Sequence, residues 1–553
     1  MRFSWILVLL ITSQAGWSQP SSSEKAWVFF VDKDVESYNP HEYLSQHTIE
    51  RRKKHNIAIY DVADIPVKQD YVNTITEMVE SLTATSRWFN AVCVYADEKS
   101  LNEIRNLDFV RDVKVVNPGG VLVAGKSIQK DLDFSLTEGQ KTYIQSQLER
   151  MEGEVFAKNN VRGQGITIAV FDVGFNSYKT NPAFKHLRDN NQIKATYDFV
   201  KNKENVDVKG SHGTTVLSCI GGRLEGQDMG LATEANYLLA RTETWTEFYS
   251  EEENWLEAVE WADKLGADII NSSLGYTYHR YFREDMDGQT SLVAKAANMA
   301  ASKGILVVNS AGNEGSANWK NIGTPADADS VLSIGAISPY TGVHTSFSSF
   351  GPTWDKRLKP NVSAYGHGMV ATPDGVGEVQ GTSFSSPLIA GFAACAMQSR
   401  PAYSNMKLFH DIQKSADLYP YYDYAHGYGI PQASYFFKMP QQQTPEFALE
   451  LTNTAVKINL KPRDNGLQPA EQDRNGVYFT KWPDYVFYHV ENDRGYLDKY
   501  VVVDPELEDR EASSVDIDGT VSDSPLKILK SELNRPCTLR VYYRGATQEI
   551  TVK

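Results

Sequence analysis

Ser383 stands in a stretch of small residues, VQGTSFSSPLIAG at 379–391, that becomes apolar behind it. Serine and threonine cap helix N-termini and proline is tolerated in the first helical turn, so this stretch predicts the start of a helix. A serine there can also act as a nucleophile, because the positive end of the helix dipole favours a developing anion. A serine hydroxyl nevertheless needs a base that takes its proton. The stretch alone therefore leaves a capping role and a catalytic role open.

Asp172 and His212 supply the groups that such a serine needs. Asp172 ends a predicted buried strand in IAVFDVGF, and His212 opens a predicted apolar helix in GSHGTTVLSCIGG. Imidazole accepts a proton near neutral pH, and a buried carboxylate holds its tautomer and stabilises the cation that forms. The chain order Asp, His, Ser is one of the few that such triads use. Each residue alone has a structural interpretation, but the three together predict nucleophilic catalysis.

Asn313 adds a hydrogen-bond donor of the kind that acyl transfer requires. In VVNSAGNEG it lies just past a predicted buried strand, between Gly312 and Glu314. A fixed amide donor stabilises the negative charge that develops on the carbonyl oxygen, and the backbone N–H of Ser383 can be the second donor. Taken alone, Asn313 is equally well explained as a turn residue. In the company of the three triad candidates, we expect it to stabilise the oxyanion.

Residues 143–439 contain the strands and helices that must position these side chains. ITIAVF reads as a buried strand, and NWLEAVEWADKLGADIINSSLG as a helix with one apolar face followed by a strand. SLVAKAANMAASKGILVVNSAGNEG repeats that arrangement, with Gly304 ending the helix. Such repeats predict an α/β fold with a mainly parallel sheet and helices on both faces. In such sheets, active sites gather at the carboxyl ends of the strands.

Two further domains flank this region. Residues 25–118 predict a small α+β domain, with strands in AWVFFVD, FNAVCVYA and VRDVKVV and helices in SQHTIERRKKHN, DYVNTITEMVESL and KSLNEIRNL. The basic run RRKK in the first of these helices is expected to face solvent. Residues 119–142 lose all periodicity and predict a linker. After a Pro/Gln break, residues 446–553 contain short runs rich in Val, Tyr and Thr, which predict a β-sandwich.

The first 18 residues are typical of a secretory signal peptide. Arg2 precedes an apolar stretch from Trp5 to Ile11, and small residues follow up to Ser18. This apolar stretch is too short to cross a bilayer, and no later stretch approaches membrane length. We therefore expect a secreted protein, located outside the cell, at its surface or in the periplasm, without a membrane span after signal removal.

Composition narrows the class further. A formal net charge of −15 and the lack of a suitable basic run exclude a nucleic-acid binder. Four cysteines in 553 residues are too few for a disulfide framework, although a Cys219–Cys395 bridge stays open. Asp198, Asp207 and Asp228 could offer oxygens to a structural calcium ion, but no ordered ligand loop is visible. No metal or other cofactor is therefore expected.

Four motifs, FDVGF, SHGTTV, SAGNEG and GTSFSSP, resemble those of the subtilisin-like serine peptidases, or subtilases, and their spacing fits that family's layout. The resemblance covers residues 143–439. It implies a subtilisin-like fold and a serine endopeptidase that works through an acyl-enzyme. The implied roles are orienting group for Asp172, general base for His212, nucleophile for Ser383 and oxyanion donor for Asn313. Val173 and the run Phe384-Ser385-Ser386 depart from the family's usual residues but remove no functional group.

The resemblance also implies substrate contacts and precursor processing. In SSLG at 272–275, an implied edge strand, Ser273, Leu274 and Gly275 would pair with the substrate backbone. Ser310, Gly312 and Glu314 would line the pocket for the side chain before the cleaved bond, and Glu314 suggests tolerance for a basic side chain there. Residues 25–118 resemble propeptides that template folding and block the cleft, so self-cleavage is expected within 119–142. The expected partners are protein or peptide substrates and the chain's own propeptide.

Other interpretations stay open. An inactive relative that acts as a binding module would keep the fold, although no triad member is missing here. A non-peptidase serine hydrolase such as an esterase normally carries G-x-S-x-G and the order Ser, Asp, His, which this chain lacks. Residues 25–118 could be a permanent accessory domain. The role of residues 446–553 is not defined by their sequence.

Overall fold

The computed structural model describes most of the chain, in two compact units. The smaller unit comprises residues 23–35 and 65–116, and the larger one comprises residues 36–64 and the described residues from 126 onward. The predicted signal peptide 1–18 lies outside the described residues. The described ranges are 23–116, 126–131, 133–244, 249–278, 280–437, 444–461, 484–505, 514–515, 521–522 and 526–553.

The smaller unit is a four-stranded antiparallel sheet with two helices. The strand order is β2-β3-β1-β4, and the core includes Val28, Ile75, Val94 and Leu101. This is the α+β arrangement that the sequence predicts. The elements are β1 (Glu24–Phe30), α3 (Gln69–Met78), β2 (Ser81–Ser86), β3 (Ala91–Ala96), α4 (Glu98–Arg105) and β4 (Val110–Val115).

Residues 36–64 interrupt the smaller unit in sequence but pack with the larger one. They contain α1 (Pro40–Tyr43) and α2 (Gln46–Lys54). The Ser45 hydroxyl caps α2 by accepting the backbone N–H of Thr48 at 3.1 Å. The segment predicted as one domain, 25–118, is therefore shared between the two units.

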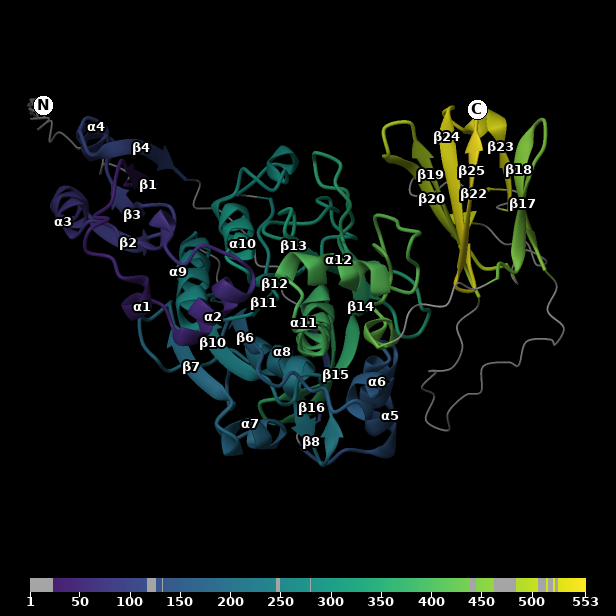
Figure 1. The fold of residues 1–553 in the computed structure, drawn as a ribbon, viewed down its shortest axis with the longest axis horizontal. Helices are drawn as coiled ribbons and strands as arrows, with labels where there is room; N and C mark the ends of the chain where they lie inside the picture. Colours follow the sequence, from purple (N-terminus) through teal and green to yellow (C-terminus); the bar gives the residue numbers. More distant parts are fainter. Residues whose placement is uncertain are drawn as a thin grey trace, which may run out of the picture. The chain divides into compact units, whose positions relative to one another are not determined.

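A seven-stranded parallel sheet forms the centre of the larger unit (Figure 1). Its strand order is β14-β13-β12-β11-β6-β10-β7, and every neighbouring pair runs parallel. The predicted α/β fold with a mainly parallel sheet is confirmed. The strands are β6 (Thr167–Asp172), β7 (Ile193–Asp198), β10 (Asn236–Arg241), β11 (Ile269–Ser272), β12 (Leu306–Ser310), β13 (Val331–Ile337) and β14 (Val362–Tyr365).

Helices cover both faces of this sheet. Ile168 and Val170 of β6 share a core cluster with residues of α8 (His212–Gly221) and α11 (Thr382–Ser399). Phe171 of the same strand instead contacts Trp255 of α9 (Ser250–Leu265), with ring centroids 5.7 Å apart. Since successive side chains of a strand point to opposite faces, α9 lies opposite α8 and α11. The remaining helices are α5 (Glu138–Glu149), α6 (Gly153–Lys158), α7 (Lys185–Asp189), α10 (Leu292–Ser302) and α12 (Asn405–Ser415).

The predicted linker 119–142 is partly ordered into elements. β5 (Lys126–Asp131) adds antiparallel to the hairpin of β15 (His367–Thr372) and β16 (Gly375–Gln380), with Lys126 opposite Gln380. Helix α5 begins at Glu138 behind a capping box of Thr137 and Gln140. The sequence of β5, KSIQKD, has one strongly apolar residue and so lacks the alternation that identifies a strand. Backbone pairing with β16 forms the strand instead.

Two antiparallel sheets form the C-terminal domain, as predicted for a β-sandwich. One has the order β17-β18-β23 and the other β20-β19-β24-β25, and both contribute to one core that includes Phe447, Ile458, Tyr488 and Leu539. The strands are β17 (Phe447–Leu451), β18 (Ala455–Leu460), β19 (Val486–Asn492), β20 (Leu497–Val503), β23 (Lys527–Leu529), β24 (Cys537–Tyr543) and β25 (Ala546–Val552). The described residues include two further antiparallel strand pairs, β8 (Arg223–Leu224) with β9 (Gln227–Asp228) and β21 (Ser514–Val515) with β22 (Val521–Ser522).

All four cysteines are buried thiols, so the Cys219–Cys395 bridge is not formed. Burial raises the pKa of the Cys219 thiol to about 12, as expected for a small apolar residue in the core. Within the described ranges, no helix is both long and apolar enough to cross a membrane.

Candidate active site

Asp172 and His212 meet at the carboxyl end of strand β6. Asp172 is its last residue and fully buried, and His212 is the first residue of α8. The imidazole Nδ1 lies 2.9 Å from Oδ1 and 3.0 Å from Oδ2 of the carboxylate. The backbone N–H of Val173 donates to the same Oδ1 at 2.8 Å, so the carboxylate keeps a donor although the family's usual hydroxyl is absent. This contact holds the imidazole ring in place through Nδ1 and leaves Nε2 as the nitrogen that can exchange a proton.

A second aspartate–histidine pair shows what distinguishes His212. His426 Nδ1 lies 2.9 Å from Asp423 Oδ2, in the same arrangement, but its Nε2 accepts the backbone N–H of His344 at 2.9 Å. Nε2 of His212 is buried and has no hydrogen-bond partner among the described residues. His426 is therefore held as a structural group, whereas His212 has an unoccupied acceptor.

Ser383 lies in the first turn of α11. The ring of Phe384, the residue after it, lies 5.5 Å from the His212 ring, centroid to centroid. The Ser383 hydroxyl donates to the backbone carbonyl of Ser273 at 3.2 Å. Among the residues that the structure describes, it has no hydrogen bond to His212. Rotation about the Cα–Cβ bond of Ser383 changes the acceptor of this hydroxyl, and catalytic hydrogen bonds in substrate-free enzymes commonly tighten on binding.

Asn313 is oriented by Thr382, the residue before Ser383. Its Oδ1 accepts the backbone N–H of Thr382 at 2.9 Å and the Thr382 hydroxyl at 3.0 Å. Its Nδ2 is buried and has no partner within the described part of the chain. The amide therefore offers a fixed N–H donor beside the N-terminus of α11. Sequence reasoning missed the role of Thr382, although the motif GTS contains it, because threonine at a helix start is commonly a cap.

The predicted substrate strand differs from expectation. Residues 272–275 were expected to form an edge strand, but Ser272 ends β11, which lies inside the sheet between β12 and β6. Ser273, Leu274 and Gly275 continue beyond that strand, and Tyr276 then forms an antiparallel bridge with Thr324. Asn309 Nδ2 donates to the Leu274 carbonyl at 2.9 Å and holds the segment in place. The segment thus continues from the carboxyl end of an interior strand. In parallel sheets, ligands bind beyond these carboxyl ends.

Ser310, Gly312 and Glu314 follow β12, the strand next to β11. Ser310 is the buried last residue of β12, and Gly312 has a φ of 113°, which an L side chain rarely adopts. The Ser349 hydroxyl accepts the backbone N–H of Glu314 at 3.0 Å. Glu314 is half-buried, and burial raises the pKa of its carboxyl above the usual range. The three residues lie in the loop that also carries Asn313.

A further buried acid lies beside this site and was not singled out from the sequence. Glu243 follows β10, and burial raises its pKa to about 7. The hydroxyl of Tyr276 donates to its Oε1 at 2.7 Å. The negative charge of Asp172 contributes to this rise as well. A lone glutamate after a strand carries no pattern that would have identified it.

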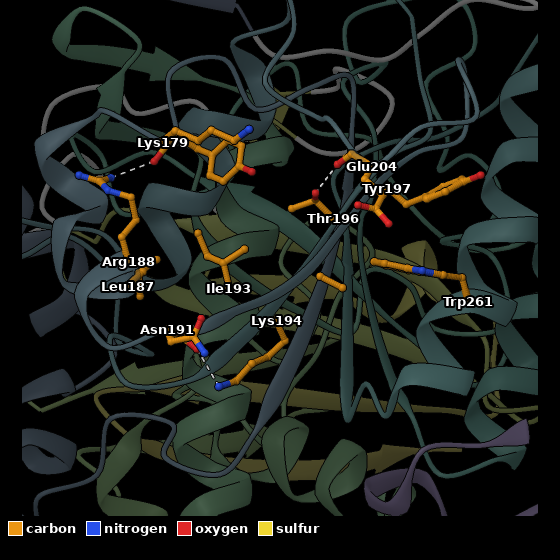
Figure 2. A pocket seen from close by; sticks show the side chains of 12 residues that line it. Lys179, Leu187, Arg188, Asn191, Ile193, Lys194, Thr196, Tyr197, Glu204 and Trp261 are labelled. Carbon is orange, nitrogen blue, oxygen red and sulfur yellow. Dashed lines mark hydrogen bonds between the residues drawn. The ribbon is translucent and has the colours of Figure 1, made fainter. Parts of the chain in front are cut away.

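A hollow of about 560 Å³ lies at the edge strand β7, and none of the predicted site residues lines it. Figure 2 shows its basic side chains Lys179, Arg188 and Lys194 and its aromatic Tyr197 and Trp261. It is therefore separate from the catalytic residues.

The carboxylates considered for calcium have protein partners. Asp198 pairs with Arg241 at 3.0 Å, Asp228 pairs with Arg223 at 2.5 Å, and Asp207 accepts the N–H of Ser177 at 2.8 Å. Across the described residues, no three His, Cys, Asp or Glu side chains gather as a metal site would require.

Comparisons with known proteins agree with this arrangement. Residues 163–429 match the profile of the subtilase family, and residues 25–130 match the peptidase S8 propeptide domain of Bacteroidota. Subtilisin NAT of Bacillus subtilis subsp. natto is 26% identical over 349 residues, 62% of this chain and 80% of the relative. The minor extracellular protease Epr of Bacillus subtilis is 26% identical over 328 residues, 59% of this chain and 46% of the relative.

A solved structure has the same fold. The crystal structure of fervidolysin from Fervidobacterium pennivorans, a keratinolytic enzyme related to subtilisin, matches with a TM-score of 0.54 at 16% identity, over 95% of this chain and 71% of that one. Fold and relatives together define a serine endopeptidase, an enzyme that hydrolyses peptide bonds. Residues 163–429 therefore form a subtilase domain, and residues 25–130 match that family's propeptide domain.

Proposed function

We propose that this chain is an exported endopeptidase that cleaves proteins through an Asp172–His212–Ser383 triad and is made as a precursor that cuts itself. The observation that carries the proposal is a pair of buried atoms without partners in the described chain, Nε2 of His212 and Nδ2 of Asn313. Both residues are in contact with the chain neighbours of Ser383. Phe384 contacts His212, and Thr382 contacts Asn313. One atom can take a proton and the other can stabilise an oxyanion.

The reaction follows from these roles. Ser383 Oγ bonds to the peptide carbonyl carbon while its proton passes to Nε2 of His212. Asn313 Nδ2 and the backbone N–H of Ser383 stabilise the oxyanion that forms. His212 returns the proton to the leaving amine, and the acyl-enzyme remains. Water, deprotonated by His212, then attacks the acyl carbon and releases the acid and Ser383. Asp172 holds the imidazole and stabilises its cationic form throughout.

Substrate is proposed to bind along residues 273–275. Gly275 carries no side chain, and the next heavy atom to a Cβ built there is 3.7 Å away, so an extended peptide can approach its backbone. Glu314 has no ion pair among the described residues, and we propose that it accepts a basic side chain before the cleaved bond.

The self-cleavage site is proposed to lie just before Lys126. Strand β5 runs antiparallel to β16, with Lys126 opposite Gln380, and Ser383 follows Gln380 by three residues. In that register, Lys126 is the β5 residue whose partner lies nearest in sequence to Ser383. We therefore expect the cut within 122–126, inside the predicted range of 119–142.

Export is proposed from the signal peptide 1–18. The relative Epr is by its name extracellular, which supports the same destination for this chain. The proposed destination is the medium, the cell surface or the periplasm. A reporter protein fused to residues 1–18 tests whether they direct export.

Mass spectrometry of the purified protein tests the proposed function. The wild-type chain should be recovered with a new N-terminus within 122–126, and a Ser383→Ala chain should persist uncut. Normal maturation of the Ser383→Ala chain would exclude intramolecular processing. An uncut wild-type chain that also fails to cleave protein substrates would favour an inactive relative that acts as a binding module.

A further inference from the structure

The basic run of helix α2 divides into two buried and two exposed residues. Arg51 and Arg52 are 4% and 0% exposed, whereas Lys53 and Lys54 are exposed. The expectation that the whole run faces solvent is therefore wrong for the two arginines. A buried guanidinium is tolerated only where acceptors surround it, so these arginines mark a site that is shaped to receive them.

Asp263, near the C-terminal end of α9, is the centre of that site. Its fully buried carboxylate accepts Arg51 Nη2 at 2.6 Å and Arg52 Nη2 at 2.8 Å. Arg51 also donates to the backbone carbonyls of Ala267 and Lys303. Lys303 is the C-cap of α10, where helix carbonyls lack partners within the helix, and Ala267 lies just beyond the end of α9. The arginines thus satisfy acceptors that the helices themselves leave open.

Lys303 forms ion pairs with two aspartates near the end of segment 36–64. Its Nζ lies 2.6 Å from Asp61 Oδ2 and 3.0 Å from Asp64 Oδ1. Arg52 Nη1 donates to the other oxygen of Asp64 at 2.5 Å. Lys303 and Asp64 are 2% and 0% exposed, so these ion pairs are shielded from solvent. Residues 36–64 are therefore held both through the last turn of α2 and through the stretch that follows it.

This network lies at the amino ends of the sheet's strands, whereas the candidate catalytic residues lie at the carboxyl ends. Helices α9 and α10 end just before β11 and β12, so their C-terminal ends lie at the amino ends of those strands. Asp268, the residue before β11, contacts the His47 ring at 2.9 Å. The catalytic residues follow the carboxyl ends of parallel strands. A segment bound at this network does not occupy the substrate cleft.

We propose that the C-terminal ends of α9 and α10 form a second binding site, whose occupant is residues 36–64 of this chain, and that this site retains the propeptide after the chain is cut. The inference rests on the proposed self-cleavage. The cut removes the covalent link through residues before Lys126, while Arg51 and Arg52 keep the segment bound. Dissociation would leave the buried Asp263 carboxylate without its two cations, which opposes release.

A Ser383→Ala chain with a recognition sequence for a site-specific protease in place of residues 119–124 separates this tether from self-cleavage. After the added protease cuts the chain, native mass spectrometry and size-exclusion chromatography follow how long the N-terminal fragment stays bound. The parent and a Lys53→Ala/Lys54→Ala control should retain it alike. An Arg51→Ala/Arg52→Ala variant should release it at least about tenfold faster, because both variants lose two charges but only one loses buried pairs.

Equal release rates for the two double variants would overturn the proposal. If the arginine variant fails to fold, Asp61→Asn serves instead, since its side chain is 41% exposed and its loss removes one contact of Lys303. That variant should release the fragment about two- to fivefold faster, and an unchanged rate would count against the tether. A wild-type chain that fails to process itself would contradict only the proposed function, since here the cut is made externally.

Discussion

At the scale of single residues, Thr382 connects Asn313, the proposed oxyanion donor, to Ser383, the proposed nucleophile. Its N–H and hydroxyl both donate to Asn313 Oδ1, and its hydroxyl accepts the N–H of Gly312 at 3.3 Å. Since the amide oxygen is occupied, the amide nitrogen of Asn313 is left as the donor. Thr382 is therefore a positioning residue that acts through Asn313.

Replacing Thr382 by valine should lower kcat by about tenfold and leave KM within about twofold, because the backbone contact to Asn313 remains. Asn313→Ala should lower kcat further, by about 100- to 1,000-fold, since the donor itself is lost. Steady-state kinetics on a short peptide substrate measures both. Recovery of kcat in Thr382→Ser is part of the expectation, and a Thr382→Val enzyme with full kcat would contradict the positioning role.

Glu314 should favour basic side chains before the cleaved bond, and more so as pH rises. Because burial raises its pKa, the carboxyl keeps its proton to a higher pH than an ordinary glutamate does, and it becomes an anion as pH rises through that pKa. Glu314→Gln should reduce the ratio of kcat/KM for lysine over norleucine by about 10- to 100-fold at alkaline pH. A peptide-library profile without lysine or arginine enrichment in the wild-type enzyme would remove this role.

The candidate site residues could be proposed from the sequence because their chemistry leaves a pattern in it. Asp172 ends an apolar run, Asn313 follows one and His212 precedes one. Each has small neighbours, so both type and position are readable. Thr382 and Glu243 could not be assigned in the same way. Their roles depend on which atoms meet them from distant segments, Asn313 and Tyr276 respectively.

At the scale of elements, the start of α8 is pressed against the end of β6. A Cβ atom at Gly213 would lie 2.5 Å from the Gly174 carbonyl oxygen and 3.0 Å from the Cβ of Asp172. Only glycine after His212 allows the helix to approach this closely. The distance between His212 and Asp172 therefore depends on the packing of a helix on a strand.

Gly213→Ala should move α8 away from β6 and weaken the Asp172–His212 contact. We expect kcat to fall by at least about tenfold and stability by about 1 to 3 kcal/mol, the usual range for overpacking. Activity assays and thermal unfolding measure the two effects. Gly368→Ala is the matched control, because the nearest atom to its added Cβ lies at an ordinary 3.5 Å. Equal behaviour of the two variants would contradict the packing argument.

Elements with strong apolar periodicity could be predicted from the sequence. Features that depend on backbone pairing or ion pairs with distant parts of the chain could not. The helix–strand repeats around β11 and β12 show regular apolar spacing, and the structure has them as expected. The sequence of strand β5 lacks alternation, so only its pairing with β16 in the folded chain identifies it as a strand. The two buried arginines of α2 resemble surface residues in sequence, since burial of a cation depends on partners such as Asp263 more than 200 positions away.

At the scale of the whole molecule, the C-terminal domain contacts the peptidase region through aromatic side chains and a buried histidine. His489 of β19 is fully buried and stacks on Tyr421 with ring centroids 5.0 Å apart. Its Nδ1 donates to the Tyr422 carbonyl at 2.5 Å, and its Nε2 lies 3.3 Å from Arg540 Nη1. Burial lowers the pKa of His489 to about 4, so the ring stays neutral in the folded chain.

Acid should therefore weaken this junction. Between pH 4 and the ordinary pKa near 6.5, the unfolded chain binds a proton that the folded chain does not, so stability falls as pH falls through that window. Compared with pH 7.5, the loss at pH 4 from this residue should be about 2 to 3 kcal/mol. His489→Asn keeps a donor for Tyr422 and should show a flatter pH dependence in chemical denaturation. An unchanged pH dependence would contradict the assignment.

The most direct measurement is the site of covalent labelling by a serine-directed fluorophosphonate, located by tandem mass spectrometry. We expect one adduct, on Ser383 of the processed enzyme, and a labelling rate lower by more than about 1,000-fold in His212→Ala. An adduct on a different serine, or a folded and processed enzyme whose Ser383 stays unlabelled, would contradict the claim that His212 activates Ser383.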